Sequence, residues 1–334
     1  MENIRIIKTF LILVMGGTLL VFPFLGFAYD DKTTHPALTQ EIVKFFNKSF
    51  PEKNINNDDA ELIIQGSIEE DSDIRWMRHF YDPVYNRGLT LSTKEQQLAQ
   101  ISAALGDQAG KSGNWPSAKN WAKDTNLQAG FTNNLAAGIF KNYFSSDSDY
   151  SWERAVYEYT WADKNRGLTG LGHILHLLED MTVPDHTRND PHPPILDMGS
   201  PYESWTTKFN RENFNIDPSE KPIILSNLND YFDKVANYSN NNFFSKDTIL
   251  NPEYLSPKIV ERRIEELNDG KNYLFGYGQN ELKNKIRLVL IKEANSWSEP
   301  EYSLRDNDNL ILSDYWLLLS KQAVLNGAGV VKLF

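Results

Sequence analysis

Leu171-Gly-His-Ile-Leu-His-Leu-Leu-Glu-Asp-Met-Thr-Val-Pro-Asp-His186 is the stretch of this sequence that decides most about its fold and chemistry. Its apolar residues recur at helical spacing until the proline, so the pattern predicts a buried helix followed by a loop. His176 and Asp180 are four residues apart and therefore share one face of that helix. His186 follows from the loop, and together these side chains offer a metal three ligands. A helical His-x-x-x-Asp pair is a weak signal alone, and His192 six residues later strengthens it.

Residues 1–28 have the pattern of a secretory signal peptide. A basic start precedes a long apolar run, which ends in Gly26-Phe27-Ala28 with small residues at the −3 and −1 positions of a cleavage site. The alternative is an uncleaved membrane anchor, since the run is almost long enough to span a bilayer. Two glycines and a proline inside the run favour cleavage. We therefore expect a secreted or periplasmic protein whose mature domain is residues 29–334.

The composition excludes several classes of protein. The chain has 334 residues, no cysteine and a net charge of −11, with 34 Lys and Arg against 45 Asp and Glu. Such a charge repels nucleic acid and anionic membranes unless metal ions reverse the field locally. The lack of cysteine excludes a lipoprotein anchor and a disulfide framework. Stability outside the cytoplasm must then come from the core and from bound metal.

The remaining sequence predicts an all-α fold, a single mainly helical domain. No stretch alternates strands and helices as a parallel sheet requires. Residues 190–201 contain four prolines and are predicted to be a loop. Apolar residues at helical spacing predict helices over residues 34–46, 60–68, 93–105, 132–143, 152–162, 167–181 and 312–334. The helices over 152–162 and 167–181 are both expected to be well buried.

Residues 250–300 are the least clear part of the sequence. Tyr273–Tyr277 and Ile286–Ile291 are short apolar runs that fit either strands or helices. We expect this part to be a small insertion in the helical domain.

Each histidine has an acidic residue or the expected new N-terminus close by in the sequence. His35 follows the cleavage point, and His79 begins the phrase His-Phe-Tyr-Asp-Pro shortly after Glu69-Glu70-Asp71. A Tyr-Glu pair ending at Glu203 follows the central phrase. Imidazole and carboxylate are the ligands that zinc prefers, and a carboxylate can bridge two ions.

This ordered set of motifs resembles the zinc-dependent phospholipase C family, which shares its fold and trinuclear zinc site with the single-strand-specific zinc nucleases. The matches run from residue 29 to about residue 205, and the last third of the chain carries no diagnostic motif. The phrase Leu-Gly-x-x-Leu-His-x-x-x-Asp-x-x-x-Pro-x-His is highly specific in combination with His-Phe-Tyr-Asp-Pro. The resemblance implies two or three zinc ions. The first would be held by Asp71, His79, His176 and Asp180, and the second by His35, Asp180 and the amino group and carbonyl of Tyr29. The third would be held by His186, Glu203 and one further histidine.

Three departures from the family pattern bear on this assignment. The mature chain would begin with Tyr29 where the family has Trp, and main-chain ligands tolerate that change. The family has a histidine four residues before the ligand glutamate, where this chain has Gly199, and we assign His192 to that role. Glu69, Glu70 and Asp73 compete with Asp71 for the carboxylate role.

Each of these residues also has a structural interpretation. His173 faces the same side of the helix as His176 and is expected to support the site or pack in the core rather than bind metal. His35 and His79 taken singly fit a helix start and a packing position. Four aromatic residues flank ligand positions and fit either core packing or a wall for a substrate head group: Trp76, Phe80, Tyr81 and Tyr202.

The resemblance implies an exported zinc-dependent phosphodiesterase that hydrolyses phospholipids, with membrane surface contact and Asp71 as the group that accepts a proton from water. A single-strand-specific nuclease on the same metal core is a second hypothesis. It is disfavoured by the acidic charge and by the lack of basic clusters around aromatic residues. A third hypothesis is a zinc-stabilised protein that binds lipid or a partner without turnover. It is favoured by Gly199, which stands where the family has a ligand histidine. The sequence does not specify an oligomeric state.

Overall fold

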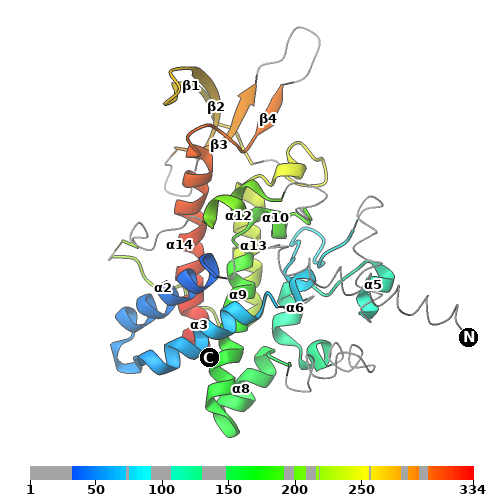
Figure 1. Ribbon diagram of the computed structural model, residues 1–334, viewed down its shortest axis with the longest axis vertical. Helices are drawn as coiled ribbons and strands as arrows, with labels where there is room; N and C mark the ends of the chain where they lie inside the picture. Colours follow the sequence, from blue (N-terminus) through cyan, green and yellow to red (C-terminus); the bar gives the residue numbers. More distant parts are fainter. Residues whose placement is uncertain are drawn as a thin grey trace, which may run out of the picture.

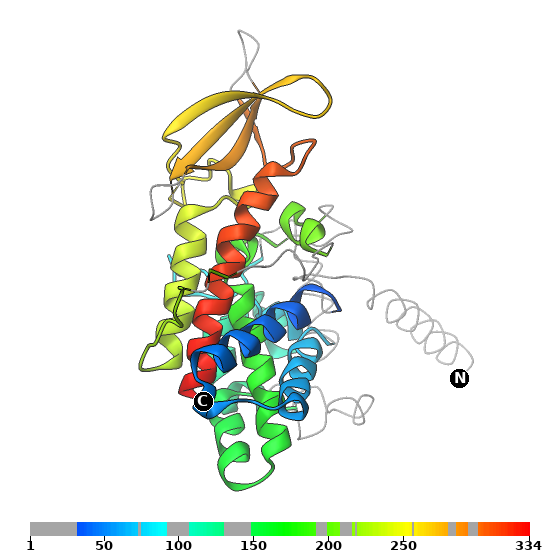
Figure 2. The same cartoon turned by 90° about the vertical axis from the view of Figure 1, so that its left-hand side faces the viewer.

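The structure is a computed structural model that describes residues 32–72, 75–91, 107–129, 148–191, 199–207, 216–217, 219–255, 257–279, 285–292 and 300–334. Helix α9 (Lys164–Asp180) runs through the middle of the helical part. A four-stranded sheet lies at one end and α8 (Trp152–Trp161) at the other (Figure 1). Figure 2 shows α13 (Leu228–Asn242) and α14 (Leu310–Leu333) side by side beneath the sheet.

Five of the predicted helices form in the structure. They are α2 (Thr34–Ser49), α3 (Asn57–Glu69), α8, α9 and α14. The helices predicted over residues 93–105 and 132–143 lie outside the described residues. Further helical segments are η2 (Pro51–Lys53), η3 (Arg75–Arg78), α5 (Gln108–Ser112), α6 (Ala118–Lys123), α10 (Pro184–Thr187), α12 (Pro201–Thr206), α13 and η5 (Lys246–Thr248).

Two prolines begin helices where the sequence predicted loop. Pro184 starts α10 and Pro201 starts α12, each at the first turn. Proline suits this position because its fixed φ is helical and its missing N–H would have no partner inside the helix. His186 therefore lies on a short helix, and Glu203 lies on another.

The expectation that α8 is well buried is wrong. Only Ala155 and Glu158 of α8 are buried, and Trp161 is 79% exposed. One face of α8 packs on α9, Trp152 and Tyr159 contact the ring of Phe334, and much of the remaining surface is exposed because α8 lies at the end of the molecule. Helix α9 itself is buried from Gly167 to Asp180, apart from Thr169.

The predicted all-α fold class is also wrong. Four strands form an antiparallel sheet in the order β1 (Glu261–Glu266), β2 (Asn272–Gln279), β3 (Lys285–Lys292) and β4 (Glu301–Ser303). Strand β3 packs on α14, and the fully buried Phe275 of β2 belongs to the same hydrophobic core. Tyr315 of α14 donates a hydrogen bond to the carbonyl of Leu288 at 2.9 Å. Burial against this helix stabilises the two runs as strands.

Helices α3 and α9 approach each other at two glycines. A Cβ at Gly66 would lie 2.0 Å from the carbonyl oxygen of Thr169, and one at Gly172 would lie 2.0 Å from that of Ile63. Glycine is therefore required at both positions for this backbone separation. The close approach brings the end of α3 beside the histidines of α9.

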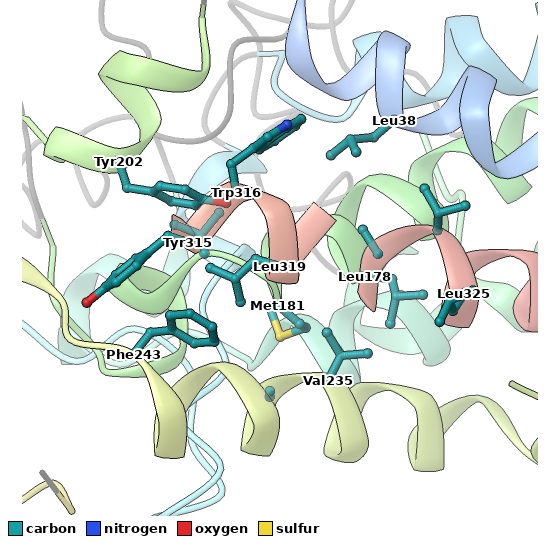
Figure 3. Close-up of a cluster of buried hydrophobic side chains, with 14 of the residues drawn as sticks. Leu38, Leu178, Met181, Tyr202, Val235, Phe243, Tyr315, Trp316, Leu319 and Leu325 are labelled. Atoms are coloured by element: carbon teal, nitrogen blue, oxygen red, sulfur yellow. The ribbon is translucent and has the colours of Figure 1, made fainter. Parts of the chain in front are cut away.

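The main core joins the helices that surround the end of α9. Figure 3 shows Leu38 of α2 and Leu178 of α9 near Leu325 of α14, and Tyr202 of α12 beside Tyr315. The ring centroids of the two tyrosines are 6.1 Å apart. This packing fixes α12 and with it Glu203, the next residue in the chain. Among the described helices, none is both long and apolar enough to cross a membrane.

Candidate metal centre

The structure brings together seven of the nine predicted ligand residues. They come from six different segments, namely the start of α2, the residues after α3 and η3, the end of α9, α10 and α12. The seven are His35, Asp71, His79, His176, Asp180, His186 and Glu203. The remaining two, Tyr29 and His192, lie outside the described residues.

Four ligand atoms form a compact group at the end of α9. Nδ1 of His79 lies 3.0 Å from Oδ2 of Asp180, 3.4 Å from Oδ1 of Asp71 and 3.4 Å from Nε2 of His176. Nε2 of His176 lies 3.4 Å from the same Asp180 oxygen and 3.6 Å from the same Asp71 oxygen. Ligands of a tetrahedral zinc ion, bound at about 2.0–2.2 Å, are roughly 3.3–3.6 Å apart. These five distances are close to that spacing. Candidate ligand atoms that all lie within 4.8 Å of one another form two groups that share His176: His79, His176 and Asp180 make one, and His35, Asp71 and His176 make the other.

The other oxygen of Asp180 faces a second group. Oδ1 lies 3.5 Å from Nε2 of His35 and 3.5 Å from Nδ1 of His186. The opposite ring nitrogen of His186 lies 3.1 Å from Oε1 of Glu203. The carboxylate of Asp180 thus stands between two sets of nitrogen atoms, which is the arrangement a bridging ligand requires.

Asp180 is buried without ordinary partners. Its side chain is fully buried, and neither carboxylate oxygen accepts a hydrogen bond from the part of the chain that the structure describes. Buried carboxylates are normally hydrogen-bonded or paired with a cation. A divalent ion at these oxygens would remove the cost of burying them.

Hydrogen bonds behind the site orient two of the histidines. Nδ1 of His176 lies 2.6 Å from the carbonyl oxygen of Ser67, which can only accept. Nδ1 must then carry the proton, so Nε2 presents its lone pair to the four-atom group. Nδ1 of His35 lies 2.7 Å from Oε2 of Glu179. The other oxygen of Glu179 accepts a hydrogen bond from Thr39 at 2.8 Å.

Burial sets the protonation of the histidines. It lowers the pKa of His35 and of His79 well below the ordinary value, and neighbouring histidines add to the shift. For His176, burial outweighs the opposing effect of Glu70 and lowers the pKa to about 3. These imidazoles are therefore neutral, which is the form that binds metal.

Asp180 has the opposite shift. Burial raises its pKa well above the ordinary value, and the carboxylates of Asp71 and Glu203 add to the effect. The site thus gathers acids, and in the part of the chain that the structure describes the basic residues beside Asp180 are histidines, with no Lys or Arg. A bound divalent ion would favour the ionised carboxylate and displace its proton.

The three rival carboxylates have different positions. Glu70 is fully buried and binds the guanidinium of Arg75 at 2.6 Å, and its nearest approach to His79 is 3.8 Å. Although burial alone would raise its pKa, Arg75 and His173 bring the pKa of Glu70 down to about 2. Glu69 lies 3.8 Å from His173, and Asp73 lies outside the described residues. Asp71 is the acid of this segment that approaches both His79 and His176.

His173 lies outside the group of ligand atoms. Its ring stacks on Tyr150 with centroids 3.9 Å apart, and its Nδ1 contacts Oε2 of Glu70. Arg75 and Trp121 donate to the same carboxylate, at 2.9 Å for the indole nitrogen. His173 therefore belongs to a buried polar network on the outer side of His79.

The flanking aromatic residues pack rather than form an open wall. Phe80 stacks on His186 with centroids 4.5 Å apart, and Trp76 packs in the same small hydrophobic cluster. Tyr81 and Tyr202 belong to the main core. All four side chains are buried, so they support the ligand residues from behind.

Gly199 has a conformation that suits glycine. Its φ is 72°, in the left-handed region that other residues adopt at a cost. A histidine at this position, as in the family pattern, would be strained in this backbone.

Glu179, Thr39 and the carbonyl of Ser67 were missed in the sequence. The available signal was Glu179 itself, an acid between Leu178 and Asp180 on a helix that is otherwise buried and apolar. A buried acid needs a partner, and here the partner comes from α2, distant in sequence. No protein-family model, curated protein or solved structure matches this chain.

Proposed function

We propose that this chain is an exported zinc-dependent phosphodiesterase of the phospholipase C type. The observation that carries the proposal is the close group of His79, His176 and Asp180, at distances near those between zinc ligands, with Asp71 within 3.6 Å of both histidines. Two further observations support zinc binding. The hydrogen bond from Nδ1 of His176 to the Ser67 carbonyl leaves Nε2 with a free lone pair for a metal, and neither Asp180 oxygen accepts a hydrogen bond from the described residues. The motif resemblance adds the reaction class.

The residues would divide between two or three ions. Asp71, His79, His176 and Asp180 would hold the first. His35 and the other oxygen of Asp180 would hold the second, together with main-chain atoms of Tyr29 if the resemblance holds. His186 and Glu203 would begin a third site that His192 completes.

When bound, such ions would supply Lewis-acid polarisation of a phosphate ester and a water molecule of lowered pKa. The protein would position the substrate and move the proton. Asp71 suits proton transfer because its side chain is 15% exposed, whereas that of Asp180 is fully buried. The hydrophobic packing behind His186 would exclude bulk water from the inner side of the pocket.

The charge of the chain favours lipid over nucleic acid as substrate. A net charge of −11 opposes binding of a polyanion, whereas a phospholipid presents a single phosphodiester per molecule. Contact with a membrane surface follows from this substrate class.

The test uses the chain that begins at Tyr29, without an N-terminal tag. Hydrolysis of a phosphorylcholine ester is measured with added zinc, after chelation and after zinc is restored. We expect activity that chelation removes and zinc restores, and lower activity in a matched chain with an N-terminal extension. Release of nucleotides from single-stranded DNA or RNA would instead identify a nuclease. Bound zinc without turnover on either substrate would identify a non-catalytic binding protein.

A further inference from the structure

Two Glu-Asp pairs contribute to the metal centre, and within each pair the carboxylates face different ways. The aspartates, Asp71 and Asp180, lie against the histidine nitrogens of the four-atom group. The glutamates, Glu70 and Glu179, are fully buried behind the histidines. Each pair therefore supplies one group to the inside of the centre and one group to its support.

The two glutamates differ in what they contact. Glu70 is occupied by Arg75, Trp121 and His173, and its distance of 3.8 Å from Nε2 of His79 is too long for a hydrogen bond. Glu179 contacts a histidine of the centre directly, with Oε2 at 2.7 Å from Nδ1 of His35. Its second oxygen is held by the hydroxyl of Thr39.

We infer that Glu179 is a positioning residue for the ion held by His35 and Asp180, an inference that rests on the proposed zinc-dependent function. With an ion bound at Nε2 of His35, which lies 3.5 Å from Oδ1 of Asp180, the Nδ1–H of that ring donates a hydrogen bond to the Glu179 carboxylate. A carboxylate in this position fixes the orientation of the ring and makes it a stronger ligand.

The direct contact of Glu179 with a metal-centre histidine is with His35, a ligand of one ion. His176 receives its support from the Ser67 carbonyl, and His79 has no contact with Glu179 among the described residues. The ring of His35 stacks on that of His176 with centroids 3.6 Å apart, so Glu179 reaches the first ion, held by His79 and His176, only through that ring contact. Glu179 sets the affinity of the second ion and hence how many ions the protein retains when zinc is scarce.

The test measures zinc stoichiometry by elemental analysis and the zinc dissociation constants by competition with a chromophoric chelator. It compares the chain starting at Tyr29 with its Glu179→Gln, Thr39→Val and Glu69→Gln variants. We expect Glu179→Gln to weaken one ion by about 10–100-fold and the other ions by much less. Thr39→Val should weaken the same ion by less. Glu69→Gln is the matched control at a half-exposed acid and should change neither constant.

The inference is overturned if Glu179→Gln leaves every zinc constant unchanged, or weakens all ions equally while lowering the thermal stability of the metal-free protein. If that variant does not fold, unchanged constants for Thr39→Val overturn it as well. Failure of the proposed function has a different signature, because the unsubstituted chain would then bind no zinc or fail to hydrolyse the ester.

Discussion

Helix α9 and strand β3 are both buried apolar segments, and they differ in where their partners lie in the sequence. Helix α9 carries two ligand residues one turn apart, so that His176 and Asp180 meet without any tertiary contact. Strand β3 is stabilised by pairing with β2 and β4 and by packing on α14. Ligand residues that lie on one helix can therefore be predicted from their spacing in the sequence. A strand cannot be predicted in this way, because it depends on segments elsewhere in the chain.

The largest effect should come from Asp180→Asn, which removes the carboxylate that faces both groups of histidines. We expect binding of the two adjoining zinc ions to weaken by more than about 100-fold. Loss of a residue that only hydrogen-bonds to a metal ligand weakens binding by at most about 100-fold, and loss of a ligand itself should exceed that. Zinc content after dialysis measures the change. Asp269→Asn, in the hairpin between β1 and β2, is the control and should keep the full zinc content. Equal zinc content in the two variants would show that Asp180 of α9 does not bind zinc.

The sheet should affect stability without affecting zinc. Phe275→Ala removes a fully buried ring from β2 and should lower the free energy of unfolding by about 3–5 kcal/mol, measured by denaturant titration of the metal-free protein. Its zinc dissociation constants should equal those of the unsubstituted chain. Ile264→Ala is the control, because that side chain is 66% exposed and should cost less than about 0.5 kcal/mol. A large loss of zinc affinity in Phe275→Ala would show that the two regions are coupled.

Gly172→Ala should affect stability and zinc together. The added methyl group would meet the carbonyl of Ile63 and separate α3 from α9, at a cost of about 1–3 kcal/mol in unfolding free energy. Because Ser67 would move away from His176, zinc affinity should fall as well. Asn165→Ala, at an exposed position of α9, is the control and should change neither quantity. Loss of stability with unchanged zinc affinity would contradict the role given to the contact of α3 with α9.

The smallest effect should come from the link between β3 and α14. Asp314 accepts hydrogen bonds from the backbone N–H of Arg287 at 2.8 Å and from its guanidinium at 3.1 Å. Asp314→Ala should lower the free energy of unfolding by about 1 kcal/mol with unchanged zinc binding. Glu301→Ala removes an exposed ion pair with Lys292 from the same sheet and should have no measurable effect. Equal losses in the two variants would contradict this assignment.

The helices were predictable where the apolar period is long. α9 and α14 follow from their patterns, and their ends differ from the predicted bounds by a few residues. The sheet was not predictable by the same means, because runs as short as Tyr273–Tyr277 have no decisive period. The missed signal was Asp269-Gly270 before the run Tyr273–Tyr277, since Gly270 has a φ of 72° in the turn between β1 and β2.

The candidate ligand residues could be predicted from residue type and spacing in the sequence. The residues that hydrogen-bond to those ligands could not. His35 and Glu179 are 144 positions apart, and only the packing of α2 against α9 brings them together. The choice among Glu69, Glu70 and Asp71 likewise depends on how the chain turns after α3. Adjacent acids point in different directions there, and no local pattern distinguishes them. The metal assignment itself stays a prediction.

The most direct test of the central claim is anomalous diffraction at the zinc absorption edge from crystals of the mature chain. If these residues bind zinc, a zinc peak is expected about 2.0–2.2 Å from Nδ1 of His79, Nε2 of His176 and one oxygen each of Asp71 and Asp180. A second peak is predicted between His35 and the other oxygen of Asp180. Zinc-soaked crystals with no peak among these four residues, or with zinc only at other positions, would contradict the account.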